Sequence, residues 1–202
     1  MKLYIVRHGE TMFNVKRIVQ GWCDSPLTAK GRMQAKACGI GLKDVPFIAA
    51  YCSTSERTLD TALGILAGRD LAVQALKALK EMNFGEAEGE PMSEWFDSQD
   101  AIQEKFASCG GETFAEAGQR ALSAWKAIAE KHDEGNVLIV THGAVIMAGM
   151  QALTPEETAR QLASGHAPEN CSVTILEYTG DSLMPVTVFD TSFREKGEGG
   201  QV

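Results

Sequence analysis

The chain has 202 residues, of which 44% are hydrophobic and 23% charged, and this composition excludes collagenous, disordered and disulfide-dense proteins. Its formal net charge of -8 argues against nucleic-acid binding, which needs a basic face, and against binding to an anionic membrane surface. Five cysteines without a C-x-x-C pair predict free thiols in a reducing compartment, so we expect a cytoplasmic protein.

Apolar runs and helical periodicity predict alternating strands and helices in the first half of the chain. Residues 3–6 form a short apolar run that is typical of a buried parallel strand. The elements predicted after this run are a helix from residue 27 to before residue 46, a strand at 47–51, a helix at 56–67 and a strand at 71–76.

The second half begins with a glycine-punctuated segment, residues 84–112, that we expect to form a lid insertion with a helix at 93–106. Thr113 and Glu116 match a capping box, which predicts a helix to about residue 131. Residues 136–155 contain no Asp, Glu, Lys or Arg, but Thr141-His142-Gly143 interrupts them, so they predict a strand and a helix and no membrane span. The remaining predictions are a helix at 156–163, strands at 173–178 and 186–189, and a disordered tail at 196–202.

This alternation predicts an α/β fold, a three-layer sandwich with helices on both faces of a mainly parallel central sheet. We expect a single domain at residues 1–195. Functional residues of such sheets gather at the carboxyl ends of the strands. Arg7-His8 directly follows the first predicted strand, and His142-Gly143 comes one residue after the strand at 137–140. Both pairs are therefore candidates for one site.

The residues after the first strand indicate an anion site. A buried strand end rarely carries two side chains that can be cationic, such as Arg7 and His8, unless an anion lies there. Gly9 would let the backbone approach a ligand closely. A histidine such as His142, taken alone, is more often a hydrogen-bonded core or capping residue than a catalytic one.

Several motifs occur in order along nearly the whole chain, beginning with Arg7-His8-Gly9-Glu10-Thr11 and Asn14. The later motifs are Gln20-Gly21-Trp22 and the segments 24–28, 53–62, 79–85, 111–113, 140–143 and 170–173. Together they resemble the histidine phosphatase superfamily, which includes the cofactor-dependent phosphoglycerate mutases. In style they are most similar to small-metabolite phosphatases such as α-ribazole phosphatase.

The resemblance implies a phosphomonoesterase that uses no metal and no organic cofactor. It implies that His8 is the nucleophile, which forms a phosphohistidine intermediate. It also implies that Arg7 and Arg57 bind phosphoryl oxygens, and that His142 donates a hydrogen bond to a further oxygen.

Glu81 is the carboxyl group that the resemblance favours as general acid and then general base, ahead of the nearby Glu86 and Glu88. Supporting contacts to the phosphate are expected from Asn14, Gln20, Gly21 and Gly143.

Three other hypotheses are weighed against hydrolysis. A mutase is disfavoured because the chain has no arginine between Arg69 and Arg120, and because Phe84 stands where the mutases usually have a tyrosine. His8-Gly9-Glu10 with His142 matches the facial triad of non-haem iron, although two arginines would repel a cation. A silent phosphate-binding module is disfavoured because the catalytic set is complete.

The expected substrate is a small phosphorylated metabolite with an uncharged organic part, and sugar phosphates are equally compatible. This expectation rests on the apolar inventory of the lid segment, which comprises Met92, Trp95, Phe96, Ile102 and Phe106. No nucleic-acid or membrane partner is expected, and a homodimer is left open.

Overall fold

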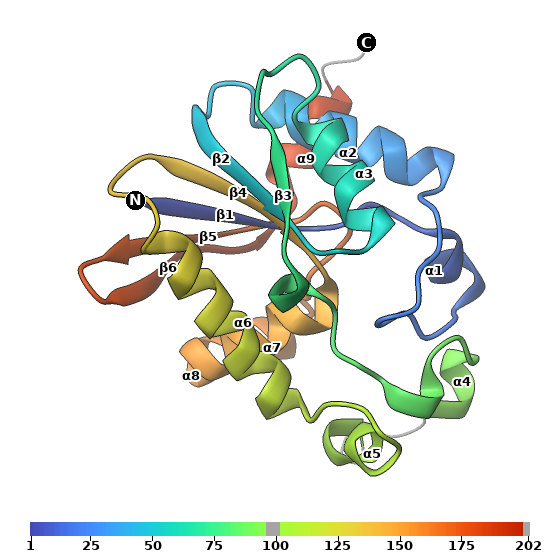
Figure 1. The fold of residues 1–202 in the computed structure, drawn as a ribbon. Helices are drawn as coiled ribbons and strands as arrows, with labels where there is room; N and C mark the ends of the chain where they lie inside the picture. Colours follow the sequence, from blue (N-terminus) through green and yellow to red (C-terminus); the bar gives the residue numbers. More distant parts are fainter. Residues whose placement is uncertain (96–101, 200–202) are drawn as a thin grey trace.

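The computed structural model describes residues 1–95 and 102–199, and its centre is a six-stranded sheet of order β3-β2-β4-β1-β5-β6 (Figure 1). Strands β1 (Lys2–Arg7), β2 (Phe47–Cys52), β3 (Val73–Ala75) and β4 (Asn136–Thr141) are mutually parallel. Strands β5 (Val173–Thr179) and β6 (Ser182–Asp190) add an antiparallel hairpin beside β1. The predicted sheet, mainly parallel, is confirmed.

Helices cover both faces of the sheet, which confirms the predicted three layers (Figure 1). One layer contains α2 (Ala29–Gly41), α3 (Glu56–Ile65) and α9 (Ser192–Gly199), and the other contains α6 (Phe114–Ala129), α7 (Gly143–Leu153) and α8 (Pro155–Ala163). Alternate residues of β1 point to opposite layers: Leu3 and Ile5 pack in the α6/α7 core, and Tyr4 and Val6 in the α2/α3 core. Burial on both faces explains why this strand is a continuous apolar run.

Two predictions about local structure are confirmed. The capping box of Thr113 and Glu116 is present at the start of α6. Residues 136–155 fold into strand β4 and helix α7, as predicted.

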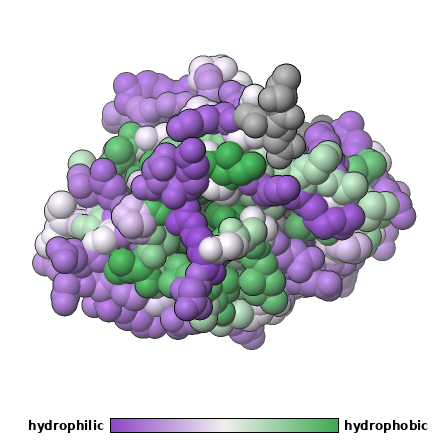
Figure 2. Space-filling model, turned by 90° about the horizontal axis from the view of Figure 1, so that it is seen from above, coloured by the Kyte–Doolittle hydropathy of each residue, from purple (hydrophilic) through white to green (hydrophobic). Residues whose placement is uncertain are grey.

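Within the described ranges, no helix is both long enough and apolar enough to cross a membrane. Hydrophilic residues cover much of the face shown in Figure 2, and hydrophobic residues show between them in separate patches.

The helix predicted at 93–106 is represented by two short helices, α4 (Met92–Trp95) and α5 (Ile102–Ser108), and residues 96–101, with Phe96, lie outside the described residues. The 3-10 helices η1 (Lys77–Leu79) and η2 (Gly85–Ala87) precede them. Phe106 is buried against Phe84, with ring centroids 4.8 Å apart, and Trp95 stacks on it. Phe106 and Trp95 therefore form the core of this segment, whereas the predicted wall residue Met92 lines a cavity.

One short helix was not predicted, namely α1 (Met12–Lys16). It begins with a capping box in which Thr11 and Asn14 bond to each other's backbone N–H groups. It ends at Arg17, whose φ of 55° is left-handed. A five-residue helix without buried residues shows too little periodicity for a sequence pattern to predict it.

The prediction of a disordered tail is wrong for residues 196–199, which belong to helix α9. Glycine at position 197 allows α9 to pack closely on α2, because a Cβ there would lie 2.0 Å from the carbonyl oxygen of Ala37. Arg194 anchors the same helix by donating to the carbonyl oxygen of Asn170. The glycines of the tail predict disorder, but Gly197 serves close packing. Residues 200–202 lie outside the described part of the chain.

We predict that Gly197→Ala lowers the free energy of unfolding by about 1–3 kcal/mol, because α9 must move away from the backbone of α2. The matched control is Gly199→Ala in the same helix, where a Cβ would meet no atom within 4 Å. Urea denaturation of both variants measures the difference. Equal stability of the two variants would contradict the docking of α9 described above.

Candidate active site

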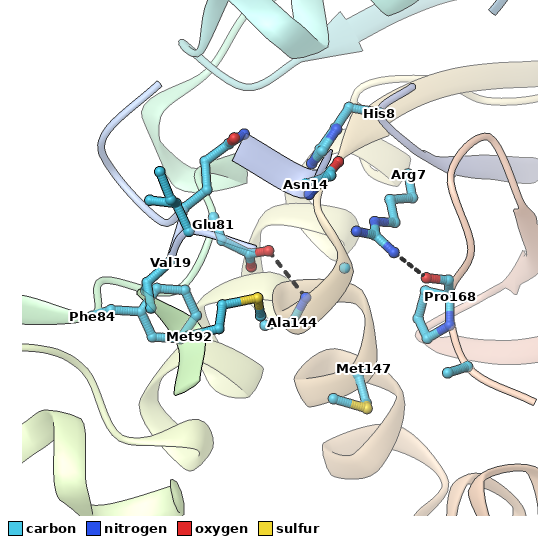
Figure 3. Close-up of a pocket in the computed structure, with 14 residues that line it drawn as sticks. Arg7, His8, Asn14, Val19, Glu81, Phe84, Met92, Ala144, Met147 and Pro168 are labelled. Atoms are coloured by element: carbon cyan, nitrogen blue, oxygen red, sulfur yellow. Dashed lines mark hydrogen bonds between the residues drawn. The ribbon is translucent and has the colours of Figure 1, made fainter. Parts of the chain in front are cut away.

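The candidate site is a cavity of about 270 Å³ at the carboxyl edge of the parallel strands. Because β1 and β4 pair in parallel with Arg7 opposite Thr141, the residues after them, His8 and His142, emerge side by side. Their ring centroids are 5.4 Å apart. In Figure 3, Arg7 and Pro168 lie on one side of the cavity and Phe84 and Met92 on the other. The strand register thus brings together the two motifs that the sequence singled out.

His8 is a buried, neutral imidazole with a defined tautomer. Its Nδ1 lies 2.8 Å from the carbonyl oxygen of Gly9, which can only accept a hydrogen bond, so Nδ1 carries the proton. Nε2 therefore bears the lone pair, and His8 lines the cavity. Burial lowers the pKa of His8 well below its usual value, and the nearby Arg57 and Arg7 lower it further. This is the protonation state that a nucleophilic imidazole needs.

Arg7 lines the cavity. Its Nη1 donates to the carbonyl oxygen of Pro168 at 2.6 Å (Figure 3). Its Nε is buried and has no hydrogen-bond partner among the described residues. Gly143 makes room for this guanidinium group, because a Cβ there would lie 3.2 Å from Nε. A buried N–H group without a partner indicates a ligand that accepts hydrogen bonds.

Two side-chain amides complete the donor set of the cavity. The oxygen of Gln20 accepts hydrogen bonds from the hydroxyls of Thr11 and Ser25, at 2.8 and 2.9 Å. Each hydroxyl already accepts a backbone N–H group, so its proton points to Gln20. Nε2 of Gln20 is thereby left buried without a partner among the described residues. The side-chain oxygen of Asn14 likewise accepts the backbone N–H group of Thr11, so its amide nitrogen is the end that remains to donate a hydrogen bond.

Arg57 is fully buried and is not among the residues that line the cavity. Its Nη1 donates to Asp24 at 2.7 Å and to the carbonyl oxygen of Cys23, and its Nη2 donates to the carbonyl oxygen of Gly21. Its Nε donates to Nδ1 of His142 at 3.1 Å. Within the described part of the chain, these bonds use four of the five N–H groups. Arg57 therefore fixes the 21–24 loop and has one N–H group left for a ligand.

His142 is engaged at both ring nitrogens. Because Arg57 can only donate, Nδ1 of His142 is the acceptor, and Nε2 donates its proton to Oγ of Ser53 at 2.7 Å. Burial lowers the pKa of His142 well below its usual value, and Arg57 adds to the effect. In this arrangement His142 orients Arg57. Donation to a ligand oxygen, as the resemblance implies, requires that Nδ1 gain a proton.

Glu81 lines the cavity and is held at the N-terminus of helix α7. Its carboxylate accepts the backbone N–H group of Ala144 at 3.0 Å (Figure 3) and those of Val145 at 2.7 Å and Met82 at 2.9 Å. The side chain is only 6% exposed, and burial raises its pKa although these hydrogen bonds and Arg57 oppose the shift. A raised pKa suits a carboxyl group that must donate a proton.

The other two glutamates of this segment do not line the cavity. Glu86 is exposed. Glu88 accepts the backbone N–H groups of Gly21, Trp22, Cys23 and Phe84. The N–H group of Gly21, expected to contact phosphate, is therefore bound to Glu88, and Gly21 lies behind the cavity wall. The geometry thus favours Glu81 among the three carboxyl groups.

Three residues of the supporting shell had no role assigned from sequence. Asn170 donates to the carbonyl oxygen of His8 at 2.9 Å, and Thr61 accepts the N–H group of Gly9 at 3.0 Å. Ser53 bonds His142. All three lie within the motif blocks at 53–62 and 170–173, and that membership is the only sequence signal that could have identified them.

Glu10 would supply the carboxylate of the alternative iron triad, but it lies apart from the site that contains His8 and His142. Glu10 accepts hydrogen bonds from Thr28 at 2.8 Å and from Lys30 at 3.0 Å, and it does not line the cavity. Among the residues that the structure describes, no three His, Cys, Asp or Glu side chains form a group that could hold a metal ion.

The lowered pKa of His8 predicts a pH dependence of stability. Below the usual histidine pKa of 6.5, the unfolded chain binds a proton that the folded chain does not, so stability is lost as the pH falls. Between about pH 7.5 and about pH 5.5, the wild type should lose about 1 kcal/mol more than His8→Gln. Urea denaturation at the two pH values measures this, with the exposed His166→Gln as control. Identical losses for the wild type and His8→Gln would contradict a buried neutral His8.

Known proteins with related sequences and structures share this architecture. Phosphoglycerate mutase from Bacillus anthracis strain Sterne matches with a TM-score of 0.89 at 31% identity, covering 98% of this chain and 96% of the other. Bacillus stearothermophilus YhfR matches with a TM-score of 0.85 at 37% identity, covering 96% and 98%. The adenosylcobalamin/α-ribazole phosphatase of Salmonella typhimurium is 35% identical over 158 residues, which are 72% of this chain and 76% of that protein.

A family model extends the likeness to nearly the full sequence. The model of the histidine phosphatase superfamily (branch 1) matches residues 3–191, a range that contains His8, Arg57, Glu81 and His142. Together with the fold and the arrangement of the cavity, this match shows that the chain belongs to branch 1 of the histidine phosphatase superfamily.

Proposed function

We propose that this protein hydrolyses phosphate monoesters of small metabolites through a phosphohistidine intermediate on His8. The observation that carries the proposal is the position of the Nε2 lone pair of His8. His8 lines a cavity together with Glu81 and with Arg7 and Gln20, each of which has a buried N–H group without a hydrogen-bond partner among the described residues. Nucleophile, anion donors and proton donor are the three groups that phosphoryl transfer to a histidine requires.

In the first step, Nε2 of His8 attacks phosphorus, and the bond between phosphorus and the leaving oxygen breaks. Glu81 gives its proton to that oxygen, so the alcohol leaves neutral. Arg7, Gln20 and Asn14 donate to the phosphoryl oxygens as negative charge spreads over them. The bond of Nδ1 to the Gly9 carbonyl holds the ring in the reactive tautomer.

In the second step, water attacks the phosphorus of phosphohistidine while Glu81 accepts a proton from that water. The bond between phosphorus and Nε2 breaks, inorganic phosphate forms, and His8 returns to its neutral state. Glu81 ends protonated, ready for the next turnover. The lowered pKa of His8 supports both steps, because a neutral imidazole is the attacking and the departing form.

The rest of the cavity supports hydrolysis of an ester with an uncharged organic part. Beyond the polar groups already described, its wall consists of apolar side chains such as Val19, Phe84, Met92 and Met147. Arg7 is the one Lys or Arg side chain among the described residues that line it. A mutase substrate carries a second anionic group, which this wall would leave unpaired. Relatives of both kinds are known, and the apolar wall supports hydrolysis.

His8→Ala should lower the rate of phosphate release by about a thousandfold or more, because the nucleophile is lost. The test uses a panel of metabolite phosphates and an aryl phosphate with released phosphate as readout, and His166→Ala as control. Assays with and without a chelator distinguish this mechanism from a metal enzyme, because a chelator should leave the rate unchanged. Near-normal turnover by His8→Ala would disprove the proposed nucleophile.

Glu81→Gln should slow esters with poor leaving groups more than esters with good ones, because only an alkoxide needs protonation as it leaves. We expect kcat/KM for an alkyl phosphate to fall about a hundredfold or more, and for 2,4-dinitrophenyl phosphate about tenfold or less. kcat/KM is the right quantity because it reports the step that forms phosphohistidine. Equal losses for both esters would remove Glu81 as the general acid.

A further inference from the structure

The backbone that carries Glu81 runs as irregular chain between η1 and η2, and a neighbouring helix holds it through side chains. Arg120 of α6 donates to the carbonyl oxygens of Ala78 at 3.0 Å, Lys80 at 2.7 Å and Glu81 at 3.1 Å. Its remaining N–H groups donate to both carboxylate oxygens of Glu112, at 2.8 and 2.7 Å. All five donors of this guanidinium group are therefore used.

Glu112 extends the same connection beyond Glu81. Its Oε2 accepts the N–H group of Asn83 at 2.9 Å, and the carbonyl oxygen of Asn83 accepts the N–H group of Glu112 at 2.8 Å. Arg120 and Glu112 together thus bind the segment from residue 78 to residue 83, with Glu81 near its middle. Neither side chain lines the cavity, and each is 21% exposed.

The two ends of Glu81 are held from opposite directions. Its carboxylate accepts N–H groups from the start of α7, as described above, and its carbonyl oxygen accepts from Arg120 and from Nε1 of Trp22 at 3.0 Å. If the carbonyl were released, the residue could rotate about its backbone. The carboxyl group would then no longer be oriented toward the leaving oxygen. General acid catalysis is sensitive to such small displacements.

We propose that the Arg120–Glu112 pair is a positioning pair that sets the proton-donor geometry of Glu81. This inference rests on the proposed role of Glu81 as general acid. The sequence singled out the motif at 111–113, and the chemistry of the cavity uses none of its residues. The positioning pair gives this motif a role. A loop whose own backbone forms neither helix nor sheet needs such external partners to keep one conformation.

The test compares Arg120→Lys and Glu112→Gln with the wild type and with Glu81→Gln. Arg120→Lys keeps the charge but loses the planar fork that binds three carbonyl oxygens and a carboxylate. Arg160→Lys is the matched control, because Arg160 is 74% exposed and pairs only with Glu157 among the described residues. For each variant, kcat/KM is measured with an alkyl phosphate and with 2,4-dinitrophenyl phosphate, and circular dichroism reports folding.

We expect Arg120→Lys to lower kcat/KM for the alkyl ester by about tenfold to a hundredfold, and for the dinitrophenyl ester by about twofold or less. Glu112→Gln should act in the same direction, and Arg160→Lys should change neither value. A merely structural role would instead lower both values equally.

The outcomes separate this inference from the function on which it rests. If Glu81→Gln shows no dependence on the leaving group, the proposed general acid is wrong, and the inference falls with it. If Glu81→Gln shows that dependence while Arg120→Lys and Glu112→Gln lower both esters equally, or neither, the inference alone is overturned. Failure of both variants to fold would also overturn the inference, because the pair would then stabilise the fold and not specifically orient the Glu81 carboxyl group.

Discussion

The chemistry of the site depends on one constraint, which is that its titratable groups are buried together. Burial disfavours the charged form of any group, so it acts in opposite directions on an imidazole and on a carboxyl group. It lowers the pKa of His8 and raises that of Glu81, and the guanidinium groups of Arg57 and Arg7 reinforce the shift at His8. The same environment therefore favours a neutral His8 and a protonated Glu81, the two forms that the proposed first step needs.

The two arginines of the site contribute in different ways. Arg7 lines the cavity, and its Nε has no hydrogen-bond partner among the described residues, whereas Arg57 does not line the cavity and binds the 21–24 loop and His142. Arg57 thus contributes through its positive charge, which lowers the pKa of His8, and through the groups that it orients. Because His142 is bound to Arg57, the second imidazole and the second guanidinium work as one unit.

Charged side chains also supply hydrogen-bond partners to loops that have none of their own. Arg120 binds three carbonyl oxygens near Glu81, and Glu88 binds four backbone N–H groups of the segments at 21–23 and 84. Asp24 accepts the N–H group of Glu56 at the start of α3. Backbone groups at the edge of a sheet must be satisfied in this way if the loops are to keep a single shape. An acidic protein can therefore hold a compact site for an anion, because several of its acids are bound to its own backbone.

The sequence by itself determined the layers of the fold and the two strand ends at which the site begins. Apolar runs and capping residues act locally, and parallel pairing brings the ends of β1 and β4 to one edge, so His8 and His142 could be placed together from the sequence. Only the tertiary structure decided which side chains line the cavity and which of their atoms are already hydrogen-bonded. The N–H group of Gly21 is taken by Glu88, 67 residues away, and His142 is bound by Arg57, 85 residues away. The order of the C-terminal helix likewise depends on the fit of Gly197 against α2. Such contacts depend on long-range packing, and local patterns of apolar and capping residues do not specify which individual side-chain atoms the fold brings into contact.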